Sequence, residues 1–128
     1  MPAKILTIVE RAYHGTLEEQ DDTVLWFNSM LLGKGPSLGF LLRGNAVNYA
    51  VAAQDASGLT IGGESFGKPP EIPNDVRLLL DRGAPVFAIV EDIDERGIPR
   101  ERLLPGIKEI HRSDLAPLLD QYDTVWHW

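Results

Sequence analysis

The chain has 128 residues, of which 44% are hydrophobic and 24% are charged, fractions that are typical of one folded globular domain. Twelve lysines and arginines stand against 19 acidic residues, and the resulting net charge of −7 argues against a basic nucleic-acid-binding surface. The sequence has no cysteine, which excludes disulfides, thiolate metal sites and cysteine nucleophiles on this chain.

The first part of the chain alternates short apolar runs with helical patterns. Residues 5–9 are apolar and rich in β-branched side chains, which predicts a strand that is buried on both faces. Thr16 and Glu19 have the spacing of a capping box, and apolar residues recur at helical spacing after them. Residues 37–42 predict a second buried strand, and Asn45 is expected to cap the helix that follows it.

The second part of the chain repeats this alternation after a long loop. Residues 55–73 are rich in glycine and proline and predict that loop, with a small extra strand over 59–61. Asn74 is expected to cap a helix that ends at Gly83, and residues 85–90 predict a third buried strand. The remaining predicted elements are a polar loop at 91–97, a helical turn at 99–106, a strand at 107–110, a helix capped by Ser113 and a strand at 124–128.

This order of elements predicts a single α/β domain over residues 1–128, with a five-stranded parallel sheet flanked by helices. We expect the flavodoxin-like strand order 2-1-3-4-5, in which a ligand binds beyond the carboxyl ends of the strands where the order reverses. That position lies between the loops after the first and third strands. The ligand-binding residues predicted there are Tyr13, His14, Gly15, Asn45, Glu91 and Asp92, with Asp94 in the same loop.

Within this predicted crevice, His14 faces two carboxylates. A histidine beside Glu91 or Asp92 could transfer protons, so these three residues are the catalytic candidates if the protein is an enzyme. The same residue types also form surface ion pairs and helix caps, which is the interpretation that we favour.

Several common α/β functions lack their sequence motifs. The turn after the first strand has one glycine, so it does not fit a dinucleotide-binding site, and residues 33–35 do not complete a phosphate-binding P-loop. Residues 63–67 resemble a nucleophile elbow but lie in a loop, and residues 91–95 lack the remaining ligands of a calcium loop. We therefore expect no metal and no cofactor.

The last predicted strand carries two tryptophans. Because successive side chains of a strand point to opposite faces, Trp126 and Trp128 are expected on the same face. An exposed aromatic face at a sheet edge is unfavourable unless another element covers it. The covering element could be a helix of this chain or another subunit, and the sequence leaves both open.

Four runs together resemble the DsrE/DsrF-like family: residues 82–90, 95–98, 103–108 and 113–115. Residues 13–16 are similar to the first crevice loop of that family. The resemblance implies one α/β domain that assembles as a homo- or hetero-oligomer, and in some members a cysteine persulfide after the third strand. The positions that correspond to family cysteines fall near Ile89 and Asp92 here, so the resemblance implies a member without persulfide chemistry.

The functional expectation is a non-catalytic DsrE-like protein that binds a partner or a small ligand, within sulfur metabolism. The alternative is a small enzyme that uses His14 with Glu91 or Asp92. We expect a homo-oligomer (a dimer or trimer) or a hetero-oligomer with related subunits, and no direct contact with nucleic acid. No run approaches the ~20 apolar residues of a membrane span, so a cytoplasmic location without membrane contact is expected.

Overall fold

The computed structural model of the protein describes residues 3–12, 23–35, 37–52, 54, 60–65 and 72–128. The first elements are β1 (Lys4–Val9), α1 (Thr23–Leu32), β2 (Ser37–Leu42), the 3₁₀ helix η1 (Gly44–Ala50), β3 (Thr60–Ile61), β4 (Glu64–Ser65) and α2 (Ile72–Asp81). They are followed by β5 (Val86–Ile89), α3 (Val90–Glu95), η2 (Arg100–Arg102), β6 (Lys108–Ile110), η3 (Arg112–Asp114), α4 (Leu115–Leu119) and β7 (Thr124–His127).

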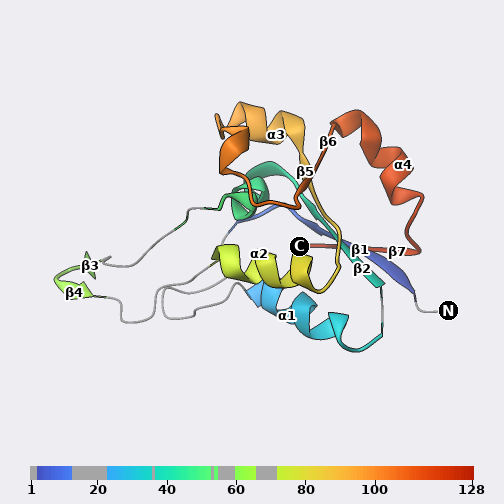
Figure 1. Cartoon of the computed structure of the whole chain (residues 1–128), viewed down its shortest axis with the longest axis horizontal. Coiled ribbons are helices and arrows are strands. Elements are labelled where there is room, and N and C mark those ends of the chain that lie inside the picture. Colours follow the sequence, from blue (N-terminus) through green and yellow to red (C-terminus); the bar gives the residue numbers. More distant parts are fainter. Residues whose placement is uncertain (1–2, 13–22, 36, 53, 55–59, 66–71) are drawn as a thin grey trace.

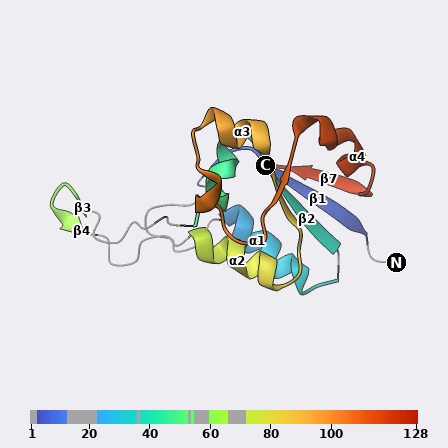
Figure 2. The same ribbon diagram turned by 45° about the horizontal axis from the view of Figure 1, so that its top comes forward.

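Five of the strands form one parallel sheet in the order β6-β5-β2-β1-β7. Helices α1 and α2 lie together on one side of this sheet, and α4 lies on the other side (Figures 1 and 2). Strands β3 and β4 pair with each other as a separate antiparallel hairpin. The predicted α/β class, with an all-parallel five-stranded sheet between helices, is confirmed.

The predicted strand order is wrong. Counted along the chain, the five strands of the sheet lie in the order 4-3-2-1-5 rather than 2-1-3-4-5, because β2 lies between β1 and β5. The cause is the burial of β2, in which residues 38–42 are all buried. A strand that is apolar on both faces needs neighbours and helices on every side, whereas the predicted order would have placed it at an edge. The more polar β6 and β7 occupy the edges instead.

The two faces of the sheet bury cores of different size. The larger core lies on the side of α1, α2 and η1, and it includes the fully buried Tyr49, Phe40 and Leu79. The smaller core lies on the side of α4, where Leu118 packs against Leu41. The sheet is therefore anchored mainly through the α1 and α2 side.

A buried polar contact fixes α1 on β1. The Thr7 hydroxyl donates a hydrogen bond to Asn28 Oδ1 over 3.1 Å, and Asn28 Nδ2 donates to the Val24 carbonyl over 2.9 Å. Just after α2, Arg82 Nη1 donates to the Ser29 carbonyl over 2.6 Å. Because buried polar groups are costly unless paired, these contacts set which side of α1 faces solvent.

One predicted loop is a helix. Residues 90–95 form α3, although the sequence there was interpreted as a polar loop. Val90 and Ile93 are both buried and stand three positions apart, which is a helical spacing, and acidic residues in the first turn suit the helix dipole. The helix ends before Gly97, whose φ of 63° is one that glycine adopts without strain.

The predicted helix-capping residues differ from the observed ones. Asn45 lies inside η1 rather than capping it, and Asn74 lies inside α2, which begins at Ile72. Ser113 lies inside η3, where the N-cap position is His111 and the Asp114 side chain accepts a hydrogen bond from the His111 backbone N–H over 2.9 Å. The predicted capping box of Thr16 and Glu19 lies outside the described residues.

Within the described ranges, no helix has both the length and the apolar character needed to cross a membrane.

Candidate ligand-binding site at the carboxyl ends of the strands

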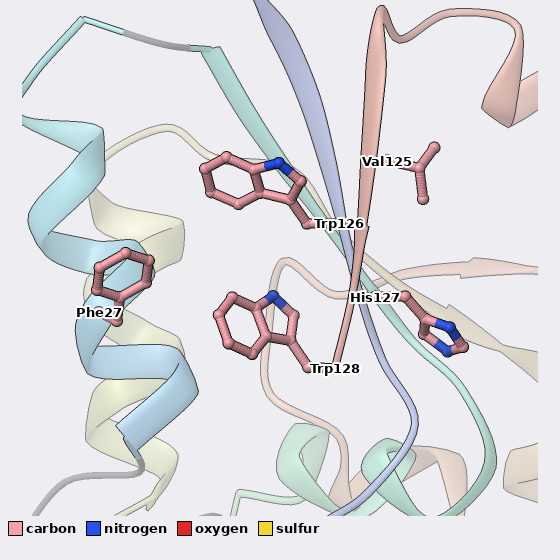
Figure 3. Close-up of a pocket in the computed structure, with 5 residues that line it drawn as sticks. All are labelled: Phe27, Val125, Trp126, His127 and Trp128. Atoms are coloured by element: carbon pink, nitrogen blue, oxygen red, sulfur yellow. The ribbon is translucent and has the colours of Figure 1, made fainter.

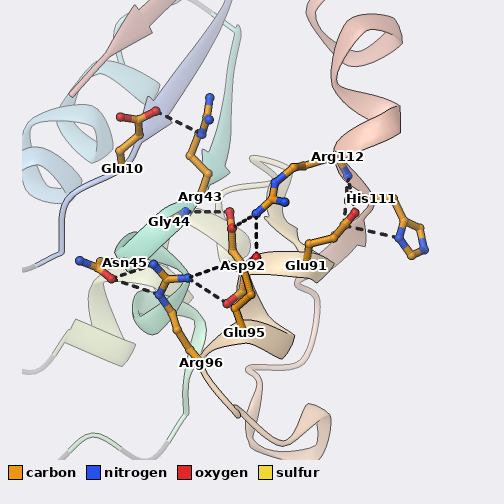
Figure 4. A network of polar contacts seen from close by, with 10 residues as sticks. All are labelled: Glu10, Arg43, Gly44, Asn45, Glu91, Asp92, Glu95, Arg96, His111 and Arg112. Atoms are coloured by element: carbon orange, nitrogen blue, oxygen red, sulfur yellow. Dashed lines mark hydrogen bonds and ion pairs between the residues drawn. The ribbon is translucent and has the colours of Figure 1, made fainter.

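A polar pocket of about 370 Å³ opens at the carboxyl ends of β1, β2, β5 and β6. We call it the carboxyl-end pocket. It is lined by Glu10 and Arg11 after β1, by Arg43, Gly44 and Asn45 after β2, by Asp92 of α3 and Arg96 just after it, and by Arg112 after β6. Figure 4 shows these residues apart from Arg11. Four successive strand ends of one sheet thus contribute to one cavity.

The turn after β2 brings backbone close to two neighbouring segments. Gly44 has a φ of 56°, and a Cβ at this position would lie 3.4 Å from the Glu10 carbonyl oxygen. The Gly44 N–H donates a hydrogen bond to Asp92 Oδ2 over 2.8 Å. A glycine at this position therefore allows the β2 turn to approach both β1 and α3.

Asp92 is the buried centre of the polar network. Its side chain is 8% exposed, and Oδ1 accepts a hydrogen bond from Arg112 Nη2 over 2.5 Å. Burial acts to raise the pKa of Asp92, but the hydrogen bonds from Gly44 and Arg112, and the charges of Arg112 and Arg96, lower that pKa below its ordinary value. The ionised carboxylate of Asp92, which belongs to α3, is thus hydrogen-bonded to the turn after β2 and to the segment after β6.

Arg96 connects α3 to η1. Its Nε and Nη2 atoms donate to Asn45 Oδ1 over 3.1 Å and 2.9 Å, and Nη1 donates to the Asp92 carbonyl over 3.2 Å. Since all three nitrogens already donate hydrogen bonds, the guanidinium of Arg96 chiefly positions the pocket wall.

Arg43 and Arg112 keep more of their donors available. Arg43 Nε contacts Glu10 Oε1 at 3.1 Å, and the two terminal nitrogens of Arg43 have no partner among the described residues. Arg112 uses Nη2 for Asp92 and, at 3.5 Å, for Glu95. The side chains of Arg43 and Arg112 are 41% and 49% exposed, so both can reach a ligand in the pocket.

The lining of the pocket differs in charge from the rest of the molecule. It holds four arginines and two carboxylates, a formal charge of +2, on a chain whose net charge is −7. A planar guanidinium matches a carboxylate or phosphate group with two parallel hydrogen bonds. The lining is therefore suited to an anion.

Glu91 lies beside the pocket rather than in its lining. Both of its carboxylate oxygens accept the Arg112 backbone N–H over 3.1 Å, and Oε1 lies 3.5 Å from His111 Nδ1. The hydrogen bond from the Arg112 backbone lowers the pKa of Glu91, and the nearby His111 and Arg112 act in the same direction. Among the described residues, histidine–carboxylate pairs are formed by His111 with Glu91 and by His127 Nε2 with Glu10 Oε1, the latter at 3.0 Å.

The structure brings together part of the predicted site. Asn45 and Asp92 line the pocket, and Glu91 adjoins it, whereas Asp94 forms an ion pair with Arg100 at 3.1 Å instead. Tyr13, His14 and Gly15 lie outside the described residues, so their predicted roles stay predictions. Glu10 and the four arginines of the lining were not among the predicted site residues. A usable signal was present, because Arg11, Arg43 and Arg112 each stand one or two positions after the end of a strand.

Among the described residues, no group of three or more histidines, cysteines, aspartates or glutamates is placed to hold a metal ion.

No family model matches the chain, and no curated protein matches it in sequence. Several solved structures share its fold. The YchN protein from E. coli has a TM-score of 0.70 and 21% identity, with 98% of this chain and 99% of that chain covered. MTH1491 from Methanobacterium thermoautotrophicum, a protein of unknown function, has a TM-score of 0.64 and 12% identity over 97% and 98% of the two chains.

A third similar structure is BT1422 from Bacteroides thetaiotaomicron, a conserved protein of unknown function. Its TM-score is 0.63 and its identity 16%, with 97% of this chain and 94% of that chain covered. At these identities the likeness shows a shared fold over nearly the whole chain, and it assigns no activity.

Proposed function

We propose that the protein binds a small oxyanion in the carboxyl-end pocket without transforming it. The observation that carries the proposal is the pair Arg43 and Arg112, two half-exposed guanidinium groups in a lining of formal charge +2. Parallel α/β sheets bind ligands beyond the carboxyl ends of their strands, which is where this pocket opens.

The lowered pKa values of Glu91 and Asp92 favour binding over acid–base catalysis. A general base works best when its pKa lies near the working pH. Hydrogen bonds from the Arg112 backbone and side chain and from Gly44 instead help to keep the pKa values of Glu91 and Asp92 low. Groups that hold their charge so firmly are suited to orienting Arg112, and they are poor proton acceptors at neutral pH.

The resemblance of residues 82–115 to the DsrE/DsrF-like family supports a role near sulfur metabolism. Because the chain has no cysteine, it cannot carry sulfane sulfur as a persulfide. Sulfate and thiosulfate are tetrahedral like phosphate, and sulfite presents three oxygen acceptors in a pyramid, so a guanidinium can pair with each of them. The pocket is therefore to be tested with sulfite and thiosulfate beside phosphate and sulfate.

The test is calorimetric titration of the protein with each of these anions, with chloride at equal ionic strength as the reference. We expect at least one oxyanion to bind one site per chain. Replacing Arg43 with methionine should weaken that binding about tenfold or more, because it removes charge-assisted hydrogen bonds and keeps most of the side-chain volume.

The matched control is Arg77→Met, since Arg77 is an exposed arginine of α2, outside the pocket lining, whose Nη1 donates to the nearby Asn74 side chain over 2.9 Å. This variant should bind the anion as the unaltered protein does. The proposal is wrong if no oxyanion binds more tightly than chloride. It is also wrong if Arg43→Met and Arg77→Met weaken binding equally, because the anion would then be attracted by overall charge.

A further inference from the structure

Among the described residues, an apolar face remains uncovered on the side of the molecule away from β6. We call it the β7–α1 face. It comprises Trp26, Phe27 and Met30 of α1 with Trp128 on the α1 side of the β7 edge, and Val125 on the opposite side of that edge. These five side chains are 50%, 41%, 50%, 43% and 40% exposed, respectively. Large apolar side chains that gather in one exposed area commonly mark an interaction site.

The aromatic residues join the helix to the strand. The rings of Phe27 and Trp128 meet edge to face, with centroids 6.1 Å apart and planes at 63°. Trp126 and Trp128 point toward α1, and Val125 and His127 point to the other side of the strand (Figure 3). A cavity of about 500 Å³ is lined by Phe27 and by residues 125–128. The face is therefore hollowed as well as apolar.

The backbone of β7 also has an open side. β7 is the last strand of the sheet, and among the described residues its ladder of backbone bonds pairs it with β1 alone. The Trp128 N–H donates to the Ile8 carbonyl over 2.9 Å, and the Trp128 carbonyl accepts the Glu10 N–H over 3.1 Å. Because backbone groups alternate in direction along a strand, those of Val125 and His127 face outward.

The other edge of the sheet shows how such a strand is normally protected. β6 has three residues, two of them the charged Lys108 and Glu109, and Arg100 forms an ion pair with Glu109 beside it. Charged side chains and short length discourage pairing with another chain. β7 is also short, with four residues, but residues 124–128 include no lysine, acidic residue or proline, so the β7 edge lacks the charged side chains that protect β6.

We propose that the β7–α1 face is the interface between two copies of this chain, with the β7 strands paired antiparallel about a two-fold axis. An axis normal to the sheet keeps the two α1 helices on the same face. The Phe27–Trp128 clusters of both copies then come together above the joined strands. One set of residues supplies both halves of such an interface, as two-fold symmetry requires. This proposal is independent of the carboxyl-end pocket.

The exposed area is sufficient for such a contact. With ~200 Å² for a fully exposed large apolar side chain, the five residues expose roughly 450 Å² on each copy. A specific interface of ordinary size buries about 800 Å² on each partner, and its central part is apolar. The five side chains thus supply about half of the area, and the paired strand backbones and their surroundings would supply the remainder. No charged side chain in the face opposes two copies meeting.

Light scattering after size-exclusion chromatography tests the proposal, from low to high micromolar concentration. The unaltered protein should have twice the chain mass of 14.2 kDa. The double variant Trp26→Glu/Met30→Glu should have half of that mass, since it places charge in the helix part of the interface. Val125→Lys should do the same through the strand edge, because lysine there is a natural protection against pairing.

The control is Leu78→Glu, which alters a 38% exposed leucine of α2 outside the β7–α1 face and should leave the dimer intact. Circular dichroism checks that each variant is folded, and the melting temperature gives a second measurement. The melting temperature of the dimer should rise with protein concentration, and that of the face variants should not. A monomeric unaltered protein would overturn the proposal. An assembly that survives both face variants would also overturn it.

Discussion

The carboxyl-end pocket and the β7–α1 face belong to the same sheet, but their side chains differ in how far contacts within the chain satisfy them. In the pocket, charged side chains from four strand ends contact one another, and the buried Asp92 is satisfied within the chain. On the β7–α1 face, aromatic side chains contact one another and still leave 40% or more of Phe27 and Trp128 exposed. The charges that line the pocket are thus paired largely within the chain, whereas the aromatic side chains of the face stay partly exposed.

This difference between the pocket and the face predicts which property of the protein a single substitution changes. A substitution in the pocket should change the stability of one chain, because the network ties together segments of that chain. A substitution on the face should chiefly change association, because its side chains contribute little while they remain half exposed. The two regions can therefore be separated by experiments on one set of variants.

The largest expected loss of stability comes from Asp92→Asn. This change keeps the volume of the side chain and removes the charge that accepts hydrogen bonds from Arg112 and Gly44. A hydrogen bond to a charged group contributes about 1.5–3 kcal/mol, so we expect the free energy of unfolding to fall by about 2 kcal/mol. Urea denaturation measures this fall.

The matched control is Asp94→Asn, two positions along the same helix. The side chain of Asp94 is 62% exposed and pairs with Arg100 at the surface. An exposed ion pair contributes little, so its loss should change the free energy of unfolding by less than about 1 kcal/mol. Equal losses in the free energy of unfolding for Asp92→Asn and Asp94→Asn would contradict a stabilising role of the buried Asp92 carboxylate.

A smaller effect is expected from pH. The pKa of Asp92 is lowered in the folded protein, so its charge stabilises the fold above the ordinary aspartate pKa. That stabilisation is lost as the pH falls through the lowered pKa. The urea midpoint should therefore drop below about pH 4, and Asp92→Asn should drop less than the unaltered protein. A parallel drop in both proteins would show that other carboxylates control the acid response.

The sequence predicted the elements of the fold better than their arrangement. Short apolar runs indicated β1, β2 and β5, because a strand that is buried on both faces has few alternatives. The order of strands was missed, although the uninterrupted burial of β2 was visible as continuous apolar character. Helix α3 was missed because four acidic residues among 91–95 suggested a solvated loop, and only Val90 and Ile93 reveal its buried side.

The site was predictable by place and only partly by residue. The carboxyl ends of the strands were the expected location, and Asn45 and Asp92 do line the pocket. The expected reversal of strand order between the first and third strands is wrong, because β2 lies between them and the order reverses between β1 and β7. Arg43 and Arg112 were missed because an arginine just after a strand is common on surfaces. Only the strand order brings these two side chains into one cavity. Long-range contacts of this kind depend on topology, which periodicity does not encode.

The most direct test of the central claim is a titration with phosphate, sulfate, sulfite and thiosulfate in turn, followed by the backbone amide signals of the isotopically labelled protein. We expect saturable shifts at Gly44, Asn45 and Arg112, which line the carboxyl-end pocket, and unchanged signals at Phe27 and Val125 of the β7–α1 face. Saturable shifts confined to the pocket would establish it as an oxyanion site. Unchanged signals at Gly44 and Arg112, with shifts only beside the exposed Lys34 and Lys108, would contradict it.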